Sequence, residues 1–181
     1  MRIVKPIMFI IGMLVMLSLG YTAYRLYPRH VTLSLRGVQY QLHSLHHRRT
    51  VSLILKGTLH RSLFAKETFD GIISVRGATI SDRDNGKPLT IVFNVASGGT
   101  IIYTHWNPLS MYEYGSIFTN RDFNQFVILE FQPIGNGTGW NAQTGIVIAA
   151  PAHTPQQAVD LSNVLLRTYL KRSHVQLSGK T

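Results

Sequence analysis

The chain of 181 residues contains no cysteine, which excludes disulfides, cysteine-type zinc sites, thiol catalysis and lipid attachment through a cysteine. Eighteen lysine and arginine residues against eight acidic residues give a formal net charge of +10. This charge favours polyanionic partners, such as anionic lipid or an anionic polymer of the cell envelope. The basic residues are scattered and form no dense arm or recognition helix, which argues against nucleic acid as a partner.

The first thirty residues predict a membrane anchor. After a short tail, residues 1–5, the segment 6–24 carries no charge. As a helix it would measure about 28 Å, close to the hydrocarbon thickness of a bilayer. Arg2 and Lys5 flank one end of this segment, and Arg25 and Arg29 flank the other. Residues 25–30 are then expected to form a juxtamembrane linker.

A cleaved signal peptide is the alternative interpretation of this segment, because a charged start and an apolar stretch are typical of one. Residues 20–24 carry two tyrosines and lack the small-residue pattern of a cleavage site. An uncleaved signal anchor is therefore favoured. The positive charges flanking the segment do not decide its orientation. We expect a single-pass protein of the cell membrane with its domain outside the cytoplasm, since large domains translocate largely regardless of charge.

The following segment, residues 31–150, alternates apolar and polar residues with period two, which predicts half-buried β-strands. The phase of the alternation slips by one residue at Gly37, which predicts a bulge or a tight hairpin there. Asn85-Gly86 lies between two such runs and predicts a hairpin turn. Strands at this spacing, without intervening helices, predict an antiparallel sandwich or barrel.

The end of the chain predicts one amphipathic helix over residues 155–172. Thr154 and Gln157 form a capping-box pattern around a proline at the first helical position. Apolar residues then recur at helical spacing on one face, and they are Ala158, Leu161, Leu165 and Tyr169, with Val164 and Leu166 widening the stripe. This helix is expected to pack on the sheet and to close a single β-rich domain, residues 31–172. The polar residues 173–181 are expected to form a flexible tail.

Four aromatic residues are the candidate ligand-binding residues: Trp106, Tyr112, Tyr114 and Trp140. The first three lie in an aromatic-rich segment, and Trp140 follows a glycine-rich stretch. Exposed aromatic side chains of this kind could stack on a sugar or a peptide. The alternative is that they cover or fill the protein's own core. No motif for a cofactor is present, and no cofactor is expected.

The sequence offers weak material for catalysis or metal binding. His43, His46 and His47 are close together, but the adjacent Arg48 and Arg49 would repel a dication, so no metal site is expected. No catalytic residue is assigned. Glu113, Asp122 and Glu130 are the carboxylates on which a hydrolase would depend, and the sequence gives no distance between them.

Five segments of the chain resemble a group of small single-pass membrane proteins of Gram-positive bacteria. They are Tyr27-Pro28 and the residues 35–40, 69–73, 114–122 and 149–152. The resemblance covers most of the chain. It implies a bacterial, membrane-anchored protein, and it implies no activity and no site residues.

Two classes of function follow from these patterns. The first is a non-enzymatic β-domain that binds or scaffolds another component at the cell surface, with the lipid bilayer, an anionic envelope polymer or another envelope protein as partner. The second is a hydrolase of cell-wall polymer that uses a pair of carboxylates. The missing catalytic motifs favour the first.

Overall fold

The computed structural model describes residues 4–42, 44–62, 66–78, 86–94, 98–106, 109–167 and 169–170. For residues 4–8, 10, 25, 44–47, 105, 106 and 109 only the backbone is described. The elements in chain order are α1 (Val4–Leu26), β1 (Arg29–Gln41), β2 (Ser44–Arg61), β3 (Lys66–Arg76), β4 (Pro88–Asn94), β5 (Gly99–Trp106), β6 (Leu109–Thr119), β7 (Phe126–Glu130), β8 (Gln132–Ile134), β9 (Gly137–Gly139), β10 (Ile146–Ala150) and α2 (Pro155–Leu165).

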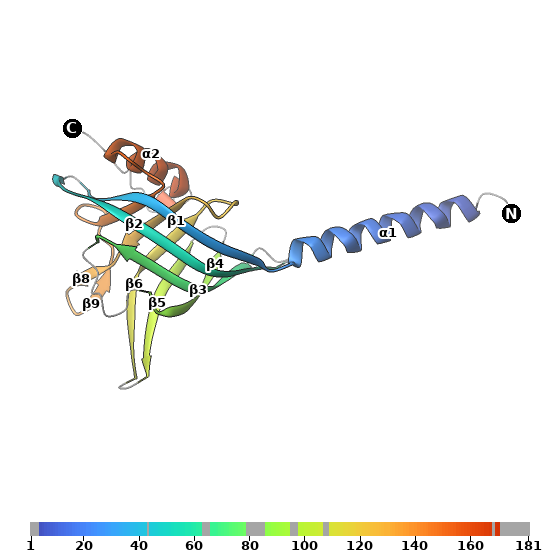
Figure 1. Ribbon diagram of the computed structural model, residues 1–181, viewed down its shortest axis with the longest axis horizontal. Helices are drawn as coiled ribbons and strands as arrows, with labels where there is room; N and C mark the ends of the chain where they lie inside the picture. The colour runs from blue at the N-terminus through green and yellow to red at the C-terminus, as the bar shows by residue number, and fades with distance from the viewer. Residues whose placement is uncertain are drawn as a thin grey trace.

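The large sheet is antiparallel and nearly closes into a barrel (Figure 1). Its eight strands follow the order β4-β3-β2-β1-β10-β7-β6-β5. The two end strands meet at one bridge between Asn94 and Gly98. β8 and β9 form a separate small sheet. The predicted β-rich fold is therefore confirmed, and of the two predicted architectures the structure adopts the barrel-like one.

The inside of the barrel is filled by side chains, because alternate residues of each strand point inward. The largest fully buried side chains include Phe69, Phe126 and Tyr114. Gly57 on β2 faces Gly71 on β3, and the ring of Phe69 covers both. A Cβ on either glycine would collide with the backbone of the other strand. This glycine pair lets the two strands approach closely at that point.

A second apolar core lies between the outer face of the sheet and α2. Val38, Tyr40 and Leu42 on β1 contribute to it, together with Val127 and Leu129 on β7. This second core explains the phase slip at Gly37. β1 stays continuous through Gly37, which pairs with Val51 in regular register. The predicted bulge or hairpin at Gly37 is therefore wrong: before this residue the apolar side chains face the barrel interior, and after it they face α2.

Helix α2 begins as predicted. Thr154 accepts a hydrogen bond from the Gln157 backbone, and the Gln157 side chain caps Thr154 in return. α2 itself ends at Leu165. Arg167, Tyr169 and Leu170 are again helical, and the Leu170 N–H donates to the Leu166 carbonyl at 2.8 Å. The predicted end at residue 172 lies outside the described residues. Residues 171–181, which include the predicted tail, lie outside the described residues.

The buried face of this helical segment is turned slightly from the predicted stripe. Ser162 and Leu166 have no exposed surface, as Ala158 has none. Leu161, Leu165 and Tyr169, predicted as the centre of the stripe, are half-buried at its edges. The packing of the helix on the sheet is confirmed.

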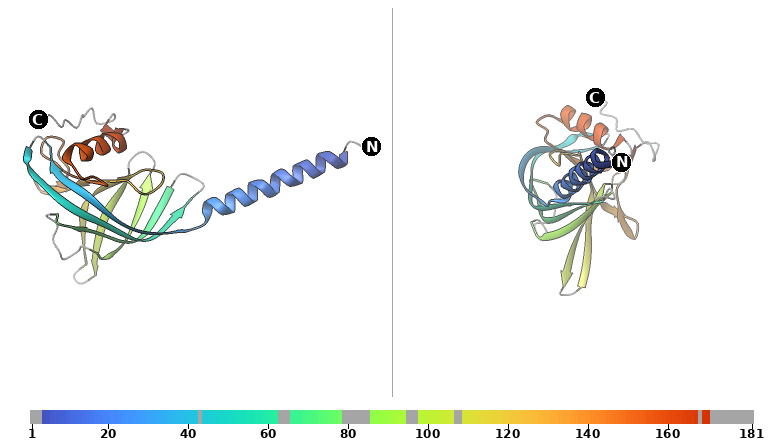
Figure 2. Two further views of the ribbon diagram at one scale, coloured as in Figure 1. Left: turned by 45° about the horizontal axis from the view of Figure 1, so that its top comes forward. Right: turned by 90° about the vertical axis from the view of Figure 1, so that its right-hand side faces the viewer.

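Helix α1 extends away from the barrel and joins it through the start of β1 (Figure 2). Its bounds exceed the predicted segment 6–24 by two residues at each end. From Phe9 to Tyr24 the large apolar side chains that the structure describes are 50–83% exposed. Within the described part of the chain, no helix combines the length and the apolarity needed to cross a membrane.

The hairpin predicted at Asn85-Gly86 joins β3 and β4, which pair antiparallel from Lys66 and Asn94 to Ile72 and Pro88. Gly86 has the positive φ angle, 84°, that such a turn needs. Asn85 lies outside the described residues. The connection from Arg76 to Pro88 is longer than a two-residue turn.

Candidate functional site

The seam of the barrel lies between β4 and β5, the two end strands of the large sheet. At its narrow end the Asn94 and Gly98 backbones exchange two hydrogen bonds of 2.9 and 3.1 Å. Gly99 allows this approach, because a Cβ there would collide with the side chain of Ile91. Beyond this point no ladder joins the two strands within the described ranges. The strands therefore diverge toward Pro88 on one side and Trp106 on the other.

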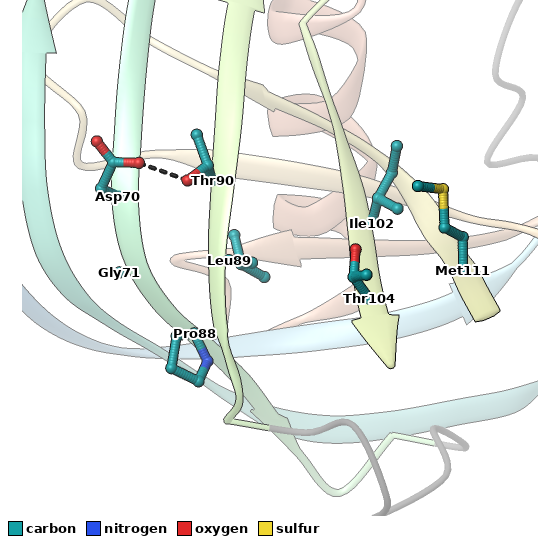
Figure 3. A pocket seen from close by; sticks show the side chains of 8 residues that line it. All are labelled: Asp70, Gly71, Pro88, Leu89, Thr90, Ile102, Thr104 and Met111. Atoms are coloured by element: carbon teal, nitrogen blue, oxygen red, sulfur yellow. Dashed lines mark hydrogen bonds between the residues drawn. The ribbon is translucent and has the colours of Figure 1, made fainter. Parts of the chain in front are cut away.

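This divergence opens a groove of about 590 Å³, which we call the seam groove (Figure 3). Figure 3 shows Pro88, Leu89 and Thr90 on one side of it and Ile102 and Thr104 on the other. Its lining residues come from β3, β4, β5 and β6, and they are Asp70, Gly71, Pro88, Leu89, Thr90, Ile102, Thr104 and Met111. Its volume lies within the range of small-ligand and peptide sites.

The lining of the seam groove is apolar and hydroxylic, with one carboxylate. The Thr90 hydroxyl donates a hydrogen bond of 2.6 Å to Asp70, and His60 Nε2 lies 3.5 Å from the other carboxylate oxygen. Met111 is 72% exposed, and Val92, two residues from Thr90 on the same face of β4, is 51% exposed. In the described part of the barrel domain, these are two of the few large apolar side chains left in solvent.

A buried polar cluster lies inside the barrel. Gln39 Nε2 donates a hydrogen bond of 2.9 Å to Glu130, and both side chains are buried. Burial raises the pKa of Glu130, and the hydrogen bond from Gln39 partly offsets this. Burial also raises the pKa of Tyr114 well above its ordinary value, and the Glu130 carboxylate adds to the shift. The Tyr114 hydroxyl has no hydrogen-bond partner within the described residues.

Of the four aromatic residues predicted to bind a ligand, the three whose side chains are described do not gather on one surface. Tyr114 is 1% exposed and lies in the barrel core, where it cannot line a surface groove. Tyr112 is half-buried against the same core. Trp140 packs against the second core, and its indole nitrogen donates to the Ile146 carbonyl at 3.2 Å. The side chain of Trp106 lies outside the described residues.

The three carboxylates considered for hydrolysis occupy different environments. Glu130 is buried beside Gln39 inside the barrel. Glu113 is exposed on β6, and Asp122 is exposed in the turn before β7. A glycosidase needs two carboxyl groups that flank one bond in a shared cleft. Because Glu130 is buried inside the barrel, it is in a different environment from the two exposed carboxylates.

The remaining predicted residues are the basic residues that flank the anchor and the histidine cluster. Arg29 is exposed at the start of β1. Lys5 and Arg25 lie in α1 with undescribed side chains, and Arg2 lies outside the described residues, as does His43. His46 and His47 lie in β2, and their side chains are not described. Among the described residues no three metal-ligating side chains come together.

No pattern in the sequence predicts the seam groove. Its residues are common types at ordinary strand positions, so no local pattern distinguishes them. Comparison of the chain with protein-family models, with curated protein sequences and with solved structures found no match.

Proposed function

We propose that the protein is a membrane-anchored, extracytoplasmic β-barrel with a binding role at the cell surface, and that α1 is its anchor. The observation that carries the proposal is the exposure of α1. Consecutive apolar side chains from Met13 to Leu17 are all at least half exposed, so along this stretch every face of α1 is apolar and none is covered by the barrel. In water, such a surface costs roughly 25 cal/mol for each Å².

A bilayer removes this cost. The uncharged run from Pro6 to Tyr24 is the segment that would lie in the bilayer. The side chains of residues 6–8 and 10 within it are not described. A helix of 23 residues is about 34 Å long, enough to cross a hydrocarbon core of about 30 Å. β1 begins three residues after α1 ends, so the barrel would sit directly on the membrane surface.

The binding role is supported by the seam groove and by the environments of the carboxylates. An open groove with exposed apolar side chains at its rim is typical of a recognition site. The three carboxylates on which the hydrolase alternative depends lie in different environments, since Glu130 is buried and Glu113 and Asp122 are exposed. The basic balance of the chain favours an anionic membrane or envelope polymer around the barrel.

Extraction of membranes at alkaline pH tests the anchor. The full chain should stay in the membrane pellet. The double variant Leu14→Arg/Leu17→Arg should shift to the supernatant, because each arginine at the centre of a helix disfavours insertion by about 2.5–3.5 kcal/mol. A matched control, Val92→Arg/Val164→Arg, places the same charges on exposed valines of the barrel and α2 and should stay in the pellet. Extraction of the unmodified chain would refute the anchor.

Thiol labelling tests the orientation. Asn163 is exposed on α2, and the chain has no cysteine of its own. Asn163→Cys should react with a membrane-impermeant thiol reagent in intact cells. Reaction only after lysis would place the barrel inside the cytoplasm.

A further inference from the structure

The seam groove exposes the edge of a β-strand. β5 pairs with β6 on one side, and beyond the bridge at Gly98 its other side has no strand partner within the described part of the chain. An unpaired edge presents backbone N–H and C=O groups that another extended chain can satisfy. Proteins usually protect such edges with charge, proline or a covering segment.

The facing edge of β4 carries protection of this kind. Pro88 has no N–H to donate, and it stands at the wide end of the seam groove. The Thr90 hydroxyl is already engaged with Asp70 on β3. The β5 side presents Ile102 and Thr104, with Met111 beside them on β6. The two edges are therefore unequal, and β5 is the one available for pairing.

The dimensions of the seam groove fit a short extended segment. Three residues of β4, at positions 88–90, line the opening on one side, and two residues of β5, Ile102 and Thr104, line it on the other. Three to four residues of a strand span about 10 Å at roughly 3.3 Å per residue. Side chains on the inner face of such a segment could cover Leu89, and those on its outer face could contact the exposed Met111 and Val92.

The negative charges at the seam groove favour a peptide segment with basic side chains. Asp70 lines one side of the groove. Glu113 is exposed on β6, where it is the strand partner of Ile102, a residue of β5 that lines the other side. Two of the eight acidic residues of a chain with eighteen basic ones therefore lie in or beside the seam groove. Lys87, the basic residue next to Pro88, is half-buried. Complementary charges across an interface fix the partner and its register.

We propose that an extended peptide segment with basic side chains adds to β5 as an antiparallel strand in the seam groove. The backbone of the segment pairs with the edge of β5, and alternate side chains point toward Leu89 and into solvent. Its basic side chains lie near Asp70 and Glu113. This inference rests on the binding role proposed above and names the class of partner.

A peptide titration tests the inference on the full chain in detergent micelles. The probe is a fluorescein-labelled octapeptide of alternating valine and lysine, followed by anisotropy. Saturable binding is expected, with amide protection from hydrogen exchange gained at residues 102–104. Glu113→Lys should weaken binding about tenfold or more. Asp160→Lys makes the same change of net charge on α2 and should weaken it by less than about twofold.

Three results would overturn the inference. One is equal weakening by Glu113→Lys and Asp160→Lys, which would indicate unspecific attraction between charges. Another is equal affinity for a peptide of the same charge with prolines in place of alternate valines, because proline cannot form the ladder. The third is no saturable binding up to about 1 mM. Membrane extraction is independent of all three, so the anchor can stand if the peptide inference fails.

Discussion

Leu166 fixes the helical C-terminal segment to the barrel, and Leu166→Ala should destabilise the whole domain. The side chain of Leu166 has no exposed surface, and it packs in the second core with residues of β1, β7 and β10. Truncation of a fully buried leucine to alanine costs about 2–5 kcal/mol, through lost transfer free energy and the cavity left behind. Against a total stability of roughly 5–15 kcal/mol, this is a large fraction.

The melting temperature should fall by about 4–20 °C, since 1 kcal/mol corresponds to roughly 2–4 °C in a domain of this size. Val164→Ala is the matched control. Val164 lies two residues away and is 61% exposed, so its truncation should change stability by no more than about 0.5 kcal/mol.

Urea unfolding of the full chain in mild detergent, followed by circular dichroism and tryptophan fluorescence, measures both variants. The two signals should shift together for Leu166→Ala, because the helix and the sheet share one core. Equal effects of Leu166→Ala and Val164→Ala would refute the packing argument. A separate early loss of helical signal would make α2 an independent module.

Three further predictions concern the barrel and the helix cap. Burial raises the pKa of the Glu130 carboxyl above 4.5, so the folded state binds this proton more tightly than the unfolded state does. The contribution of this group to stability is therefore complete below pH 4.5, and it is lost as the pH rises through the pKa of the folded state. Glu130→Gln should therefore flatten that loss and raise the unfolding free energy at pH 7, and a lower value at pH 7 would contradict it. Gly57→Ala should cost about 1–3 kcal/mol by overpacking against β3, whereas Gly137→Ala, where space is open, should change urea stability far less. Thr154→Ala should cost about 1 kcal/mol in the same assay, and Thr154→Ser should restore most of it, because the cap needs only a hydroxyl oxygen.

The sequence alone determined the kinds of element and their order. Period-two runs such as Leu89, Ile91 and Phe93 identify strands because one buried face forces alternation. Thr154 and Gln157 identify the start of α2, since a cap forms within four residues of chain. These signals are local, so they require no knowledge of distant segments. The apolar run that forms α1 is local in the same sense.

Tertiary structure decided which faces are covered and which residues meet. At Gly37 the alternation changes phase because α2, more than a hundred residues later, covers the outer face of β1 beyond that point. Tyr114, predicted as a surface aromatic, is inside because closure of the sheet turns its side of β6 inward. The seam groove exists because β4 and β5 diverge beyond Gly98, which leaves the edge of β5 open beside Asp70. Such contacts depend on how the sheet curls and closes, and periodicity records only whether a face is buried, never which segment buries it.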